Sequence, residues 1–94
     1  RPYELAYHFR VNNASGRTVV YEFRGNAHEI KPRYMTRHTA CLPGEIAFRK
    51  PGTNEVIARY EARDGDVFVL RQRNEGVNVE LVRSSGQTGG KASR

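Results

Sequence analysis

The sequence is poor in the residues and motifs that would place it in several common protein classes. It has a single cysteine, Cys41, so no disulfide can form within the chain. It has no tryptophan, and no apolar run approaches the roughly 20 residues that a membrane-spanning helix needs. A G-x-S-x-G elbow, a P-loop, a G-x-G-x-x-G turn and a C-x-x-C pair are all absent. We therefore expect a protein without a membrane span, without a cofactor and without enzymatic activity.

What the sequence does contain is a period-two alternation of apolar and polar side chains. Successive side chains of a strand point to opposite faces, so such alternation predicts amphipathic strands. It begins at residues 3–11, where the odd positions are Tyr3, Leu5, Tyr7, Phe9 and Val11. It returns at residues 19–24 after the polar segment 12–16, which is rich in turn-forming residues. These two strands are predicted to pair as a hairpin.

The same pattern predicts five more strands, separated by turn residues about every eleven positions. Segment 34–41 alternates only weakly, which is typical of an edge strand or of a connection between two sheets. Residues 67–70 form an unbroken apolar run, as expected of a central buried strand. Segment 25–32 is predicted to be an irregular linker from one sheet to the other, and the last four strands a meander. The five predicted strands are 34–41, 45–50, 55–62, 67–73 and 77–81.

The fold class that follows is all-β. A chain of 94 residues makes one domain. Seven short strands with regular turns are typical of a small antiparallel β-sandwich, and the strand count resembles that of immunoglobulin-like sandwiches; a small β-barrel is the alternative. The sandwich should occupy residues 1–83. Residues 84–94 contain three glycines and no large apolar side chain, which predicts a flexible tail.

The charge is strongly basic, with a net value of +6 and thirteen arginines against three lysines. Such an excess favours acidic partners. The simpler interpretation is that arginines fill the solvent faces of strands and pair with interleaved glutamates across the sheet. The densest basic and aromatic cluster lies on the segment predicted to be least packed, and it comprises Lys31, Arg33, Tyr34 and Arg37.

Three side chains are weak candidates for a metal site. His28, His38 and Cys41 lie within fourteen residues, and imidazole and thiolate are ligands that soft metals favour. However, His38 and Cys41 would face opposite sides of a strand, and a buried cysteine with surface histidines is the simpler interpretation. Asn13-Ala14-Ser15 is formally a glycosylation acceptor, but its expected role is to form the first turn.

The function that these features favour is a non-enzymatic binding module that recognises another protein or an envelope component. We expect contact through a sheet edge or the 25–43 connection, by Lys31, Arg33, Tyr34, Arg37 and His38. The alternative is a basic single-stranded nucleic-acid-binding domain, and a minor alternative is a metal carrier. The sequence does not predict the oligomeric state.

The cellular compartment has two conflicting indications. The sequence starts at Arg1 rather than Met, which would suit a processed, exported protein in the periplasm or outside the cell. The absence of a disulfide in so small a domain instead favours a reducing compartment.

Overall fold

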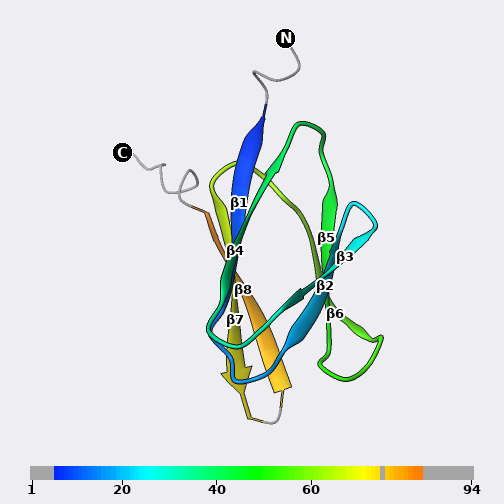
Figure 1. Ribbon diagram of the computed structural model, residues 1–94, viewed down its shortest axis with the longest axis vertical. Helices are drawn as coiled ribbons and strands as arrows, with labels where there is room; N and C mark the ends of the chain where they lie inside the picture. The colour runs from blue at the N-terminus through cyan, green and yellow to red at the C-terminus, as the bar shows by residue number, and fades with distance from the viewer. Residues whose placement is uncertain (1–5, 75, 84–94) are drawn as a thin grey trace.

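Two four-stranded sheets pack face to face in the computed structural model, which describes residues 6–74 and 76–83 (Figure 1). One sheet has the strand order β4-β1-β7-β8 and the other the order β3-β2-β5-β6. The strands are β1 (Tyr7–Asn13), β2 (Val19–Phe23), β3 (Asn26–Ile30), β4 (Met35–Ala40), β5 (Glu45–Arg49), β6 (Val56–Glu61), β7 (Asp66–Arg73) and β8 (Gly76–Arg83).

The prediction of a small all-β sandwich is confirmed. The described residues form eight strands rather than seven, and these strands do not close a barrel. All pairings are antiparallel except that of β1 with β7, which is parallel. The described residues form no helix, and so they contain no helix that could cross a membrane. The first residues of the predicted strand 3–11 and the predicted tail 84–94 lie outside the described residues.

The alternating side chains supply the core between the two sheets. The apolar face of β1 and β7 in one sheet packs against that of β2 and β5 in the other. Strand β7 lies between β1 and β8, which confirms the prediction that its apolar run marks a central strand. Strand β4 is at the edge of its sheet, as its weak alternation predicted. The largest fully buried side chains are Phe9, Tyr21, Phe48 and Phe68.

The predicted first hairpin is wrong, because β1 and β2 belong to different sheets. The alternation identified both strands but not their partners.

The buried side chain of Asn13 directs the chain across the sandwich: its Nδ2 donates hydrogen bonds to the carbonyls of Arg17 and Ile30. Its Oδ1 accepts hydrogen bonds from the backbone and the hydroxyl of Ser15. Asn13 therefore forms the turn, as expected, and its amide is not accessible to a glycan.

The segment 25–32 was predicted to be an irregular linker, and this is also wrong. It contains β3, which pairs with β2 from Phe23 opposite Asn26 to Val19 opposite Ile30. The tight turn between them is possible because Arg24 and Gly25 both adopt positive φ angles of 52° and 83°. The crossing to the other sheet comes later, at residues 31–34.

The last four strands do not form a meander, because the turn at Asp64-Gly65 crosses between sheets instead of closing a hairpin. The backbone N–H of Gly65 donates a hydrogen bond of 2.8 Å to the carbonyl of His8 on β1. The buried Asp66 accepts hydrogen bonds from the backbone of Arg63 and from Nε of Arg83. These contacts dock the turn onto β1 and β8, and only the hairpins β5–β6 and β7–β8 follow the prediction.

We expect Asn13→Ala to lower the free energy of unfolding by about 3 kcal/mol, because it removes several buried hydrogen bonds and leaves their backbone partners unsatisfied. Urea denaturation of the full chain measures the loss. Asn78→Ala, on the exposed face of β8, is the control and should change stability by less than about 0.5 kcal/mol. Equal effects of the two substitutions would contradict the central role of Asn13.

Candidate functional site

The edge of the sheet at β4 carries an unusual share of exposed apolar surface. Four large apolar side chains are more than a third exposed among the described residues, and three of them flank or begin β4. Tyr34 is 62% exposed, Met35 55% and Leu42 56%. No other stretch of the described chain concentrates such side chains, so this edge is the first candidate for a binding surface.

The turn before β4 holds the basic and aromatic side chains in one place. The backbone of Asn13 donates to the carbonyl of Tyr34 at 2.9 Å, and the backbone of Arg33 donates to the carbonyl of Asn13 at 2.8 Å. A third bond, of 3.1 Å, runs from the backbone of Tyr34 to the carbonyl of Lys31. Arg33 adopts a positive φ of 70°. The turn is thus fixed to the end of β1, while its side chains remain exposed to solvent.

Along β4 itself, alternate side chains face opposite directions. Met35, Arg37 and Thr39 are exposed, whereas Thr36, His38 and Ala40 are partly buried against the other sheet. The structure therefore brings Lys31, Arg33, Tyr34 and Arg37 to one exposed edge, and it places His38 apart from them. We name the exposed edge the β4 surface; it consists of Lys31, Arg33, Tyr34, Met35, Arg37 and Leu42.

His38 is part of an aromatic cluster between the two sheets. Its ring stacks on Phe9 with centroids 5.0 Å apart and meets His28 of β3 edge to face at 4.8 Å. Its Nε2 and the hydroxyl of the buried Tyr21 share a hydrogen bond of 2.7 Å. Burial raises the pKa of Tyr21 to about 12, so this hydroxyl stays protonated near neutral pH. Burial, and then the neighbouring His28, lower the pKa of His38.

The three weak candidates for metal ligands lie around one cavity at the open side between β3 and β4. His28, His38 and Cys41 line this cavity of about 420 Å³ together with Arg24. Over residues 6–74 and 76–83, no group of three or more His, Cys, Asp or Glu side chains is arranged to hold a metal ion. The residues are neighbours, as their spacing suggested, without forming a ligand set.

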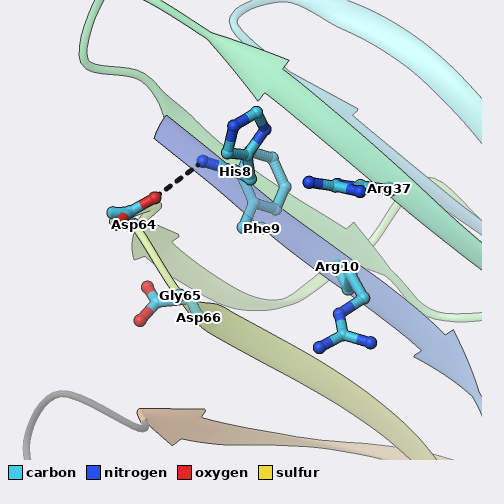
Figure 2. Close-up of a pocket in the computed structure, with 7 residues that line it drawn as sticks. All are labelled: His8, Phe9, Arg10, Arg37, Asp64, Gly65 and Asp66. Carbon is cyan, nitrogen blue, oxygen red and sulfur yellow. Dashed lines mark hydrogen bonds between the residues drawn. The ribbon is translucent and has the colours of Figure 1, made fainter. Parts of the chain in front are cut away.

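The outer face of the β4-β1-β7-β8 sheet holds a second, more polar cavity that the sequence did not indicate (Figure 2). Its volume is about 320 Å³. Arg10 of β1 and Arg37 of β4 are directly opposed across the two strands and both line it. On the opposite side, Oδ1 of Asp64 accepts a hydrogen bond of 2.9 Å from the backbone of His8. Only the β1–β4 pairing, which period-two alternation cannot reveal, brings these arginines together.

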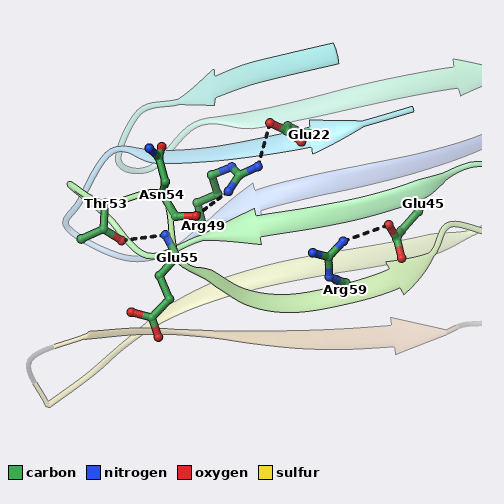
Figure 3. Close-up of polar contacts among 7 residues, drawn as sticks. All are labelled: Glu22, Glu45, Arg49, Thr53, Asn54, Glu55 and Arg59. Carbon is green, nitrogen blue, oxygen red and sulfur yellow. Dashed lines mark hydrogen bonds and ion pairs between the residues drawn. The ribbon is translucent and has the colours of Figure 1, made fainter. Parts of the chain in front are cut away.

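Three other strand arginines pair with glutamates, as the composition suggested. On the second sheet, Arg49 pairs with Glu22 at 2.9 Å and Arg59 with Glu45 at 3.2 Å (Figure 3). On the first sheet, Arg71 of β7 pairs with Glu80 of β8, 2.8 Å away. In the part of the chain that the structure describes, Arg10 and Arg37 have no such partner.

The described tyrosines do not form a platform for stacking nucleic-acid bases. Tyr21 is buried, and Tyr7 and Tyr60 pack against the core. Tyr34 is the exception, standing exposed beside β4. The aromatic alternation noted in the sequence thus serves the core.

No protein-family model, curated protein or solved structure matches this chain.

The lowered pKa of His38 predicts a loss of stability in acid. Because its pKa in the folded protein lies below the ordinary value of 6.5, the unfolded chain binds more protons between the two values. The free energy of unfolding should therefore be fully retained above pH 6.5 and decline as the pH falls below it. Urea denaturation between pH 7.5 and 5 measures this decline.

The variant His38→Gln, which keeps a polar side chain beside Tyr21, should flatten the pH profile. His8→Gln, on the outer face of β1, is the control and should keep the wild-type profile because the His38 ring is unchanged. If the stability of His38→Gln falls with pH as steeply as that of the wild type, another group causes the acid sensitivity.

Proposed function

We propose that this protein is a non-enzymatic binding module that recognises an extended, acidic segment of another protein along the β4 surface. The observation that carries the proposal is the concentration of exposed apolar side chains around one sheet edge, next to Arg37, which has no ion-pair partner among the described residues.

An edge strand offers a natural place for an extended segment. Among the strands that the structure describes, β4 pairs only with β1, so alternate N–H and C=O groups on its other side have no strand partner there. A peptide that lies beside such an edge gains main-chain hydrogen bonds and places alternate side chains in neighbouring pockets. Tyr34 and Met35 at one end of β4 and Leu42 beyond the other end would contact its apolar side chains.

The charge of this region selects an acidic partner. Residues 31–44 include Lys31, Arg33 and Arg37 but no aspartate or glutamate. Opposite charge on a partner speeds association and disfavours basic competitors. A single-stranded nucleic acid is the alternative occupant, but base stacking there could use only Tyr34 among the described tyrosines. A protein segment that combines acidic and apolar side chains would contact both the basic and the apolar side chains of the β4 surface.

Selection of random 12-residue peptides on the immobilised full chain, followed by fluorescence anisotropy, tests the proposal. Selected peptides should alternate apolar and acidic residues and bind with a Kd of about 1–100 μM. Tyr34→Ala and Arg37→Ala should each weaken binding about 5- to 30-fold, as expected for interface anchors. Arg59→Ala is the matched control: it removes an arginine from β6, an edge strand of the other sheet, and should change the Kd less than twofold.

Two kinds of result would contradict the proposal. The first concerns the peptides: they could lack acidic residues, or Arg59→Ala could weaken their binding as much as Arg37→Ala does. The second is tight binding of oligonucleotides, with affinity that falls by about 10³-fold or more between 50 and 200 mM salt, because such a slope indicates contacts to a phosphate backbone.

A further inference from the structure

Arg10 and Arg37 place two like charges opposite each other on adjacent strands. The two residues are Cα partners on adjacent antiparallel strands, and both side chains are exposed on the outer face of the sheet. Like charges directly opposite each other destabilise a sheet. Among residues 6–74 and 76–83, the one polar contact of either guanidinium is weak: Nη1 of Arg10 lies 4.0 Å from the sulfur of Met35.

The carboxylates that line the same cavity do not neutralise this pair. Asp66 is almost fully buried, and its two oxygens accept hydrogen bonds from Arg83 and from the backbone of Arg63. Asp64 binds the backbone N–H of His8 at the opposite side of the cavity. Figure 2 shows the two aspartates on one side of the view and the two guanidinium groups on the other, with His8 and Phe9 of β1 between them.

From this geometry we propose that the Arg10–Arg37 pair binds a phosphate monoester in its dianionic form. Each guanidinium presents a planar set of N–H donors that fits two oxygens. A single carboxylate can occupy one such set and neutralise one charge. A phosphate monoester has three terminal oxygens and a charge near −2 at pH 7.5, so it can engage both arginines and remove their repulsion.

The inference deepens the proposed function, because it names the group that a partner on the β4 surface would place beside Arg37. It shares Arg37 with that surface but also requires Arg10 of β1, and the cavity is on the face of the sheet rather than at its edge. A small phosphate probe therefore tests it without a peptide. Failure of the peptide selection and failure of phosphate binding can occur independently.

The test is a titration of the full chain with phenyl phosphate at pH 7.5, followed by the NMR signals of the arginine Nε–H groups. Arg10→Gln and Arg37→Gln should each weaken binding at least about tenfold, since each removes one of two charge-assisted contacts. Arg73→Gln is the matched control, because Arg73 is an exposed strand arginine opposite Gly76, which has no side chain. Its affinity should stay within twofold of the wild type.

Benzoate and diphenyl phosphate, which carry one negative charge, distinguish the sources of the anion. Both should bind at least about tenfold more weakly than phenyl phosphate. Equal binding of benzoate would overturn the preference for phosphate. Equal binding of the diester would overturn the preference for a monoester and indicate a nucleic-acid backbone instead. If Arg73→Gln reduces the affinity for phenyl phosphate as much as Arg37→Gln does, the proposed site itself is overturned.

The ligand-free protein provides an independent readout. If the two guanidinium groups repel each other, Arg10→Gln and Arg37→Gln should each raise the Tm at low salt by about 1–4 °C. Addition of 0.5 M sodium chloride should shrink the difference, because salt screens exposed charges. A lower Tm in both variants would overturn the premise that this pair is held in an unfavourable state until an anion binds.

Discussion

The side-chain amide of Asn13 connects the segments that define both the fold and the candidate binding surface. It binds the carbonyl of Arg17 in the first crossing and that of Ile30 at the end of β3. The backbone of the same residue bonds Arg33 and Tyr34 in the second crossing. A single buried polar residue therefore fixes the two crossings next to each other, and in doing so it positions the turn that presents Tyr34 to solvent. Satisfied buried networks of this kind specify one arrangement of a core.

The strands and their faces could be predicted from the sequence, whereas several of their partners could not. Alternation depends only on which side chain faces the core, so it identified β1 and β2 without showing that they lie in different sheets. Asp64-Gly65 has the composition of a hairpin turn, and what makes it a crossing is a hydrogen bond to His8, distant in sequence. The β2–β3 hairpin was missed because a non-glycine residue, Arg24, adopts a positive φ there.

The candidate site, too, could be predicted from the sequence only in part. Weak alternation in 34–41 correctly indicated an edge strand, and the basic and aromatic cluster around Tyr34 is exposed as a contact surface requires. His38 belongs to that segment, but strand geometry turns it toward Phe9 and the core. Arg10 could not be connected with Arg37 from the sequence, because 26 intervening residues separate them and only the register of β1 on β4 brings them together.

The arginine at the middle of β4 also has a consequence for how the molecules behave at high concentration. An open edge invites the same edge of another molecule to join it, which is how β-sheet proteins begin to form fibrils. Two β4 strands placed side by side would bring two copies of Arg37 close together, each already beside an Arg10. The accumulated positive charge would oppose such stacking, so the edge can remain open to a partner of different charge while the molecules repel one another.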